Sequence, residues 1–300
     1  MVRLPFGVNI NNLIDDIRIF SWEAADLMLH YSNLLKNDDN KEAILQNNIK
    51  DDPVTLADLR VNELIIQRIN EKYSEVSWGI LSEENAKLES FKLDKGSNWL
   101  WVLDPLDGTR DFIDGTNNYA MHLGLNYKQK PIFGTILIPE REELWIAYGK
   151  EVWCEKRDGS KKKTLIKNNK MLKDMTLITS KNHRNEILEN LIQKIGFKKR
   201  IIMGSIGCKF ASIARGESDI YITCSTPGGS SPKDWDFAAP EAILNAAGGA
   251  ITNIYNQNLS YGNPNFEQGG ILIASNNINK HKNLCLEIKR IIDKYNIYSF

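Results

Sequence analysis

One segment in the middle of the chain, WLWVLDPLDGTRDF at residues 99–112, constrains the fold more than any other stretch. Its apolar part, from Trp99 to Leu103, has the length and bulk of a buried strand. The run ends abruptly in two carboxylates, a proline, a glycine and a hydroxyl. Because α/β sheets present their chemistry at strand ends, the segment predicts an α/β protein with a site at residues 104–109.

Each residue type in this loop has a physical reason to be there. Pro105 fixes its own φ and pushes Asp104 toward an extended conformation, so the carboxylates of Asp104 and Asp107 can face one point. Gly108 permits a positive φ or a close approach to a ligand. Two hard oxygen ligands suit Mg²⁺, whereas two crowded carboxylates without a cation repel each other. An ordinary polar turn is the alternative for this loop taken alone.

Length and composition exclude several classes of protein. The 300 residues allow one large domain or two packed lobes. Lys+Arg and Asp+Glu are equal at 38 each, so no global basic field indicates nucleic-acid binding. No apolar run has the length of a membrane span, and residues 1–5 carry no targeting signature. Four scattered cysteines and four scattered histidines favour reduced thiols in the cytoplasm over disulfides or zinc.

Hydrophobic periodicity predicts alternating helices and strands. The expected helices cover residues 10–35, 55–72, 185–195, 209–214, 238–247 and 280–295. The expected strands cover residues 76–81, 99–103, 120–127, 131–138, 144–148, 176–179, 200–203, 219–223 and 271–274. The cationic stretch KRDGSKKK, residues 156–163, predicts a solvated hairpin tip. A change of rhythm near residue 171 predicts an N-terminal lobe of residues 1–175 and a C-terminal lobe of residues 176–300 within one compact domain.

Four acidic sites follow the ends of predicted elements. They are Asp58, Glu83, the Asp104/Asp107 pair and Asp236. Each has an ordinary structural explanation by itself: Asp58 at a helix dipole, Glu83 as a solvated loop acid, and Asp236 as a helix cap. Their combination in this order is far more specific than any one of them.

The combined motifs resemble the inositol monophosphatase superfamily of metal-dependent, lithium-sensitive phosphatases. The matching segments are DPVTLAD at 52–58, SEE at 82–84, DPLDGT at 104–109, GSIG at 204–207, WDFAA at 235–239 and AAGGA at 246–250. The resemblance spans nearly the whole chain. It implies a layered α/β/α/β/α sandwich of the inositol monophosphatase and fructose bisphosphatase type, and an enzyme that hydrolyses phosphoric monoesters.

The resemblance also implies roles for particular residues. Two or three Mg²⁺ ions would be held by Glu83, Asp104, the Leu106 carbonyl, Asp107 and Asp236. Glu83, Thr109 and Asp58 would be the catalytic residues, with Thr109 and Asp58 helping to deprotonate a metal-activated water that attacks phosphorus directly. The backbone N–H groups of Gly108 and Thr109 would hold phosphate oxygens at the start of a helix.

Within the superfamily, the chain most resembles the CysQ-type 3'(2'),5'-bisphosphate nucleotidases, which remove the 3'-phosphate of 3'-phosphoadenosine 5'-phosphate. Residues 110–112, Arg-Asp-Phe, are close to the Lys-acidic-Phe of that branch. Lys209 and Phe210 resemble a Lys-Phe pair that contacts substrate there, and a lysine suits a second phosphate as a point charge. Ser205 and Lys209 are therefore predicted to bind substrate. The alternative for Lys209 is a lysine on a helix surface.

Other features of the sequence are compatible with functions other than a bisphosphate nucleotidase. The tripeptide at 205–207, Ser-Ile-Gly, is as near to the inositol-type pattern as to the nucleotidase pattern. Thr223 stands where some nucleotidases place an arginine, with Lys233 as a candidate replacement. The alternatives are an inositol-1-monophosphatase, a weaker fructose bisphosphatase interpretation, and a catalytically silent regulator. The predicted partners are a nucleoside bisphosphate or an inositol phosphate, no nucleic acid and no membrane, with a homodimer as the candidate oligomer.

Overall fold

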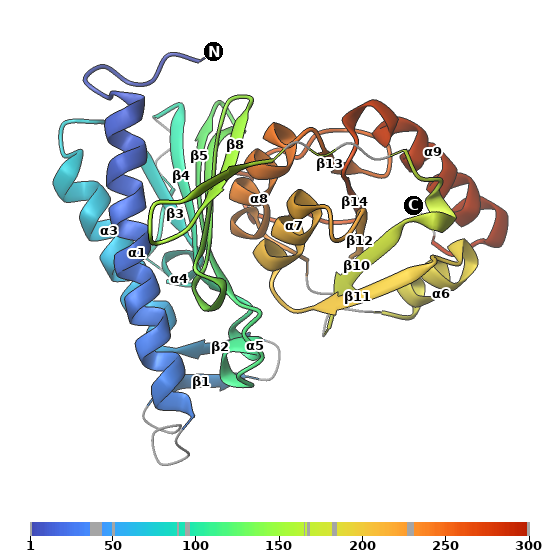
Figure 1. Cartoon of the computed structure of the whole chain (residues 1–300), viewed down its shortest axis with the longest axis horizontal. Coiled ribbons are helices and arrows are strands. Elements are labelled where there is room, and N and C mark those ends of the chain that lie inside the picture. The colour runs from blue at the N-terminus through green and yellow to red at the C-terminus, as the bar shows by residue number, and fades with distance from the viewer. Residues whose placement is uncertain are drawn as a thin grey trace.

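Two main β-sheets, of seven and five strands, and three helix layers alternate through the molecule (Figure 1). The computed structural model describes residues 2–36, 44–49, 52–88, 90–93, 97–164, 166, 169–181, 185–226 and 231–298. Helices α1 (Ile10–Leu35) and α3 (Leu56–Lys72) cover the outer face of the large sheet. Helices α7 (Ile206–Arg215) and α8 (Asp234–Ala246) lie between the sheets, and α6 (Glu186–Ile195) and α9 (Ile278–Tyr295) cover the outer face of the small sheet. The predicted α/β/α/β/α sandwich is confirmed.

The large sheet has seven strands in the order β3-β4-β5-β6-β7-β8-β9, of which β3 and β4 are parallel and the others antiparallel. Its strands are β3 (Gly79–Ser82), β4 (Trp99–Asp107), β5 (Ala120–Tyr127), β6 (Lys130–Ile138), β7 (Glu143–Tyr148), β8 (Glu151–Glu155) and β9 (Lys161–Lys163). The small sheet has the order β11-β10-β12-β14-β13. Its strands are β10 (Thr176–Ser180), β11 (Lys199–Met203), β12 (Ile220–Cys224), β13 (Ala250–Asn253) and β14 (Ile271–Ser275).

Short elements complete the described chain. They are β1 (Leu45–Ile49), β2 (Asp52–Thr55), α4 (Glu83–Ala86), α5 (Thr109–Ile113) and the 3₁₀ turns η2 (Pro139–Arg141) and η3 (Leu172–Asp174). No helix in the described residues combines the length and the apolar character needed to cross a lipid bilayer. The change from the large to the small sheet falls between β9 and β10. The division into lobes of residues 1–175 and 176–300 stays a prediction.

Most predicted elements are present, with shifts of a few residues at their ends. The helix at 10–35 and the strand at 120–127 have the predicted bounds, and residues 156–163 form the turn and last strand of the β8–β9 hairpin. The strand predicted at 99–103 was too short. A bulge between Asp104 and Asp107 lets the β4–β5 ladder continue past the proline to Asp107. Strands β1, β2, β8, β9 and β13 and the short helices α4 and α5 were not predicted.

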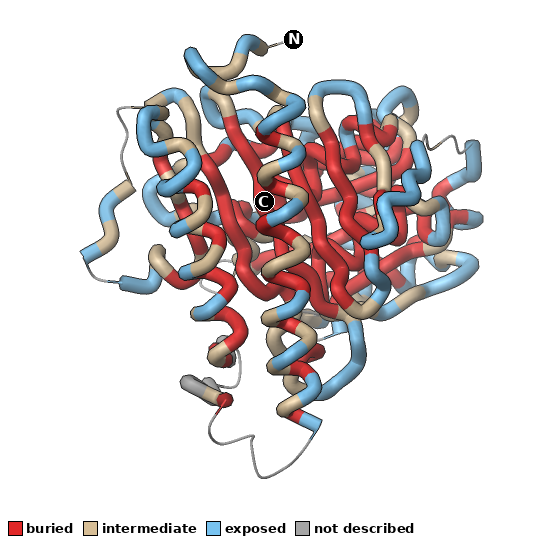
Figure 2. Tube along the Cα trace, turned by 60° about the vertical axis from the view of Figure 1, so that its left-hand side comes forward, coloured by how far each residue is buried: buried red, intermediate tan, exposed pale blue. Residues whose placement is uncertain are grey.

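The two faces of β4 pack against different layers. Trp101 and Leu103 belong to the core beneath α1 and α3, whereas Val102 belongs to the core beneath α7 and α8. Because strand side chains alternate between faces, Asp104 points to the α7/α8 side. Figure 2 shows the buried strands running through the centre of the molecule, with exposed residues on the outer helices. The end of β4 therefore places carboxylates inside the molecule, between two layers.

Two glycines let α8 approach the large sheet closely. A Cβ on Gly124 would lie 3.0 Å from the backbone nitrogen of Ala239, and a Cβ on Gly134 would lie 2.8 Å from the carbonyl oxygen of Ala239. These are backbone atoms that cannot move aside as a side chain could, so both positions require glycine at this helix–sheet distance. The close approach brings the first turn of α8, with Asp236, to the end of β4.

Candidate active site

Three carboxylates from distant parts of the chain meet between β4 and α8. Single oxygens of Asp104, Asp107 and Asp236 all lie within 4.8 Å of one another. Asp104 and Asp107 come from the bulged end of β4, and Asp236 comes from the first turn of α8. The sequence motifs predicted these three residues as neighbours, and the fold brings them together.

Burial and mutual repulsion disfavour the charged state of these acids. Burial, and then the charges of Glu83, Asp107 and Asp236, raise the pKa of Asp104 well above its usual range. Burial and the charge of Asp107 raise the pKa of Asp236 to about 6. A buried cation would offset both the burial of these charges and their mutual repulsion. A donor set made only of oxygens suits a hard divalent ion such as Mg²⁺. The residues therefore fit the metal that the family resemblance implies.

Asp107 differs from its neighbours because three protein groups converge on one of its oxygens. Its Oδ2 accepts hydrogen bonds from Ser205 Oγ at 2.5 Å and from Gly207 N at 2.8 Å, and lies 3.0 Å from His122 Nε2. Burial raises the pKa of Asp107, but His122, Ser205 and Lys209 outweigh it, so this pKa lies below its usual value. Metal binding by its other oxygen, Oδ1, stays a prediction.

His122 is a site residue that the sequence did not reveal. It lies on β5 directly opposite Asp104 and is fully buried beneath the acids. A Cβ on Gly207 would overlap its Nε2 atom, so the histidine and the glycine fit only as a pair. The sequence carried no signal for this role, because a single histidine in an apolar strand has no local signature.

Asp58 and Asp236 occupy equivalent positions in their helices. Each is the third residue of its helix and accepts a hydrogen bond from the residue before the helix: Asp236 Oδ2 from Lys233 N at 2.6 Å, and Asp58 Oδ2 from Thr55 N at 2.8 Å. Thr55 caps α3, and Asp58 three residues on completes the capping box. Each acid uses one carboxylate oxygen to cap its helix, which leaves the other oxygen for a role in the site. Capping the helix and serving the site are therefore compatible.

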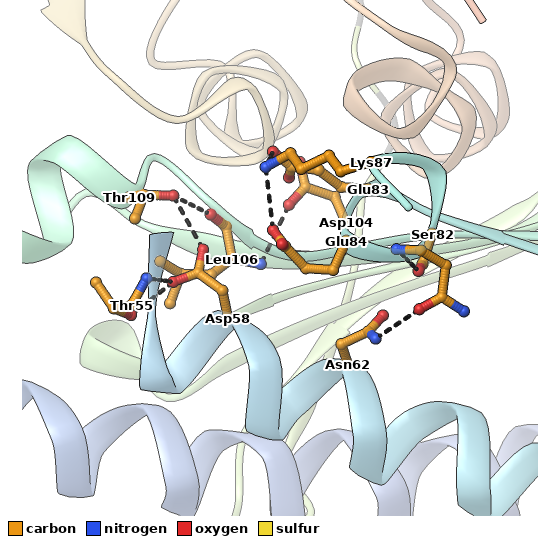
Figure 3. A network of polar contacts seen from close by, with 11 residues as sticks. Thr55, Asp58, Asn62, Ser82, Glu83, Glu84, Lys87, Asp104, Leu106 and Thr109 are labelled. Carbon is orange, nitrogen blue, oxygen red and sulfur yellow. Dashed lines mark hydrogen bonds and ion pairs between the residues drawn. The ribbon is translucent and has the colours of Figure 1, made fainter. Parts of the chain in front are cut away.

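Thr109 lies between Asp58 and the end of β4 (Figure 3). Its Oγ1 is 3.2 Å from Asp58 Oδ1 and 3.0 Å from the carbonyl oxygen of Leu106. A threonine hydroxyl has one proton, so it donates to one of these two acceptors at a time. Burial raises the pKa of Asp58 to about 7, which is the range expected of a general base that works near neutral pH.

Glu83 lies beside Asp104 at the start of α4 (Figure 3). Its Oε1 is 3.0 Å from Lys87 Nζ, which also lies 3.3 Å from Glu84 Oε1. Burial raises the pKa of Glu83 to about 8, with Lys87 opposing and Glu84, Asp58 and Asp236 adding to the shift. Glu83 is therefore in the electrostatic field of the cluster, but it is not one of the three residues within 4.8 Å. Metal binding by Glu83 and by the Leu106 carbonyl stays a prediction.

Gly108 has the backbone conformation that the sequence predicted. Its φ is +88°, and a Cβ there would lie 2.9 Å from the carbonyl oxygen of Asn118 and 3.1 Å from Ser205 Cβ. The helix that follows, α5, has only five residues, so its dipole adds little for an anion. Phosphate binding by the N–H groups of Gly108 and Thr109 stays a prediction.

Lys209 is not a surface lysine, so that alternative is wrong. Its side chain is fully buried, and its Nζ donates to the Gly204 carbonyl at 2.7 Å and to Ser180 Oγ at 3.0 Å. Burial lowers the pKa of Lys209 to about 8. Two of its three N–H donors serve the protein, and contact with substrate stays a prediction.

Ser205 and Lys233 also have partners within the protein. The Ser205 hydroxyl accepts a hydrogen bond from Cys208 N at 3.0 Å and donates to Asp107, so it positions that carboxylate. Lys233 Nζ lies 3.0 Å from Glu267 Oε1. Substrate contacts of Ser205 and Lys233 stay predictions. Residues 227–230 of the loop before Lys233 lie outside the described residues.

Comparison with known proteins identifies the family. Residues 17–292 match the inositol monophosphatase family, and the chain belongs to it. It is 33% identical over 211 residues to the 3'(2'),5'-bisphosphate nucleotidase CysQ of Buchnera aphidicola, covering 70% of this chain and 74% of that protein. It is 29% identical over 231 residues to CysQ of Haemophilus influenzae, covering 73% and 80%.

Solved structures give the same fold. The extragenic suppressor protein suhB of Bartonella henselae superposes with a TM-score of 0.71 at 19% identity, covering 94% of this chain and 99% of that one. SaIMPase-II, an inositol monophosphatase of Staphylococcus aureus, bound to inositol monophosphate, superposes with a TM-score of 0.72 at 20% identity, covering 95% and 96%. The same protein has been solved with 2'AMP. The chain is thus a metal-dependent phosphoric monoester hydrolase of the inositol monophosphatase fold.

Proposed function

We propose that this enzyme is a Mg²⁺-dependent 3'(2'),5'-bisphosphate nucleotidase that removes the 3'-phosphate of 3'-phosphoadenosine 5'-phosphate. The observation that carries the proposal is the convergence of Asp104, Asp107 and Asp236 beside the Thr109–Asp58 pair. The curated relatives that are nucleotidases support the choice of substrate.

The acids supply a site for two or three Mg²⁺ ions. The proposed ligands are Glu83, Asp104, the Leu106 carbonyl, Asp107 and Asp236. When bound, Mg²⁺ offsets the charge of the phosphate and makes water a better nucleophile at neutral pH. The residues around the acids fix their free oxygens in place, because each of Asp107 and Asp236 has its Oδ2 held by protein donors.

The Thr109–Asp58 pair handles the proton of the attacking water. Thr109 Oγ1 accepts a proton from the water while it passes its own proton to Asp58 Oδ1, 3.2 Å away. Asp58 holds that proton in a buried position, where a pKa of about 7 makes both of its protonation states accessible. The N–H groups of Gly108 and Thr109 orient the phosphate oxygens.

An inositol-1-monophosphatase is the second candidate, and a specific observation supports it. The ammonium groups of Lys209 and Lys233, the cations considered for a second phosphate, are already bonded within the protein. SaIMPase-II has been solved with an inositol phosphate and with a nucleoside monophosphate, so this fold accommodates both ligand classes.

A side-by-side rate comparison tests the proposal. The substrates are 3'-phosphoadenosine 5'-phosphate, inositol 1-phosphate and fructose 1,6-bisphosphate, each with Mg²⁺ and with EDTA. We expect kcat/KM for the adenosine bisphosphate to exceed that for inositol 1-phosphate by about tenfold or more, the value of one charge-assisted contact to a second phosphate. A preference for inositol 1-phosphate would establish the second candidate. Phosphate release from none of the three would overturn the proposed substrate class.

A further inference from the structure

A cavity of about 690 Å³ lies at the free edge of the large sheet, away from the acid cluster. Its walls are β7, the β8–β9 hairpin and the C-terminal end of α7, with Asn276 after β14 closing one side. Helix α7 has ten residues and spans about 15 Å, with Ser205 at the acid cluster before its first turn and Arg215 at the cavity in its last. The cavity is therefore separate from the phosphatase site.

Positive charge gathers in this cavity, which we name the lysine groove. Five cationic residues line it: Lys156, Lys161, Lys162, Lys163 and Arg215. The lining contains one acid, Glu143, whose Oε2 accepts hydrogen bonds from Arg215 Nη1 at 2.6 Å and from Trp145 Nε1 at 3.0 Å. Because side chains alternate along β9, Lys161 and Lys163 point away from the face of Lys162, and Lys161 Nζ lies 3.4 Å from Glu155 Oε2. Lys156 Nζ donates to the Arg141 carbonyl at 2.6 Å and lies 3.9 Å from Glu143 Oε1. The local excess of positive charge therefore comes from Lys156, Lys162 and Arg215 against the single acid Glu143.

Protection of the sheet edge explains only part of this pattern. Strand β9 is the last strand of the large sheet, and lysines at such an edge oppose pairing with another chain. However, Lys162 pairs with Cys154, which pairs with Trp145, so all three lie on the face that lines the groove. In the described part of the chain, Lys162 has no acidic partner.

We propose that the lysine groove binds a small polyanion with two or more adjacent phosphate groups. Its volume lies within the range of small-molecule sites, about 300–1,000 Å³. A cleft lined by one sign of charge concentrates field and raises the local concentration of an oppositely charged ligand. Two lysines on the two sides of the hairpin turn, Lys156 directly after β8 and Lys162 on β9, match a chain of phosphates better than one isolated charge.

Calorimetric titration with inorganic triphosphate tests the proposal on the full chain. EDTA is included, so that no metal ion draws the anion to the acid cluster, which by itself repels it. We expect one saturable site. Lys162→Gln should weaken binding about 5- to 10-fold, and Lys156→Gln/Lys162→Gln by more than the single change. Lys282→Gln, an exposed lysine on α9, is the matched control and should change affinity less than about 2-fold.

Three results would overturn the proposal. One is the absence of saturable triphosphate binding by the wild-type protein. Another is an equal loss of affinity in the Lys162→Gln and Lys282→Gln variants. The third is tighter binding in Asp104→Asn together with unchanged binding in Lys162→Gln, which would place the anion at the acid cluster. Unfolding midpoints measured for every variant show whether each is folded.

Discussion

Asp104 and Asp219 are both almost completely buried carboxylates, but their surroundings are opposite. Asp219 accepts hydrogen bonds from Lys170 Nζ at 2.7 Å, Thr176 N at 2.7 Å and Asn276 Nδ2 at 2.9 Å. Asp104 accepts one from Leu106 N at 3.1 Å, its Oδ2 lies 4.0 Å from His122 Nδ1, and it otherwise faces Glu83, Asp107 and Asp236. A buried acid with donors on both oxygens holds the fold together. A buried acid that faces other acids lowers the stability of the metal-free fold, and its oxygens can coordinate a cation.

Replacing the crowded acids should give the largest effect on catalysis. We expect Asp104→Asn or Asp236→Asn to lower kcat/KM by about 10³-fold or more, because metal ions contribute several kcal/mol of charge stabilisation. The metal-free Asp104→Asn protein should unfold at the same temperature as the wild type or higher, since one repelling charge is gone. Steady-state kinetics and thermal unfolding in EDTA measure both quantities. Retained Mg²⁺-dependent activity in either variant would contradict the metal assignment.

Substitutions in the Thr109–Asp58 pair should lower kcat without changing the affinity for Mg²⁺. We expect Asp58→Asn to lower kcat by about 10²- to 10⁴-fold, the usual contribution of a positioned base. Asparagine can still accept the Thr55 hydrogen bonds, so α3 should keep its cap. Calorimetric Mg²⁺ affinity should stay within about 3-fold of wild type. Thr109→Ser is the matched control, which retains the hydroxyl and should retain most activity. Equal kcat in Asp58→Asn and wild type would exclude a role in proton transfer.

Asp219→Asn should show the reverse pattern, with lost stability and retained activity. Its amide would place a donor against the donors of Thr176, Lys170 or Asn276, so we expect a loss of about 2 kcal/mol in the free energy of unfolding. Urea denaturation measures that loss, and kcat/KM measured well below the unfolding temperature should stay within about 3-fold of wild type. A catalytic defect as large as that of Asp104→Asn would show that the comparison between the two acids is wrong.

The pH dependence of stability should separate the metal-free from the metal-loaded protein. In the folded, metal-free state the pKa values of Asp236, Asp58 and Glu83 are raised to about 6, 7 and 8. Between pH 5 and 7.5 the folded protein therefore binds more protons than the unfolded chain, so its stability falls as pH rises. Mg²⁺ binds the charged folded form and should reverse the trend.

Unfolding midpoints in EDTA and in Mg²⁺ across this pH interval measure that effect. Asp104→Asn should flatten the metal-free profile, because it removes one of the interacting charges, whereas Asp219→Asn should leave its slope unchanged. A metal-free wild-type protein that gains stability from pH 5 to 7.5 would contradict the raised pKa values.

His122 and Gly207 should give the smallest effect. We expect Gly207→Ala to weaken Mg²⁺ binding by about 10-fold, because the new methyl group displaces His122 from Asp107. Adding His122→Ala to that variant should restore part of the affinity by removing the overlap. Calorimetry on the two variants and on His122→Ala alone measures the coupling, and strictly additive effects would show that the two residues act independently.

The sequence predicted those parts of the site whose residues are close together in the chain. The motif DPLDGT predicted Asp104, Asp107 and the positive φ of Gly108. It could do so because a strand end, a proline and a glycine each restrict the backbone of the residues next to them. The Thr55–Asp58 cap was predictable for the same reason. The end of β4 was misplaced because a bulge depends on the partner strand, which local periodicity does not describe.

Long-range packing explains what the sequence did not predict. The role of His122 in the site depends on its position opposite Asp104 and beside Gly207. Both contacts join residues from different strands or layers. Lys209 resembled an exposed or substrate-facing lysine, but α7 lies between two sheets and buries nearly every side, so no solvent face exists for it. Gly124 and Gly134 set the distance from β5 and β6 to α8, and a glycine in a strand does not indicate which helix approaches it.

The paired use of Asp58 and Asp236 as helix caps limits how this site can be redesigned. A glutamate at either position would keep the charge but carry the carboxylate past the backbone N–H that it now accepts from, at Thr55 or Lys233. Side-chain length there is thus set by helix geometry and not by the radius of the ion. An engineer who wanted a larger cation would instead vary Glu83, a proposed ligand whose carboxylate is paired with Lys87.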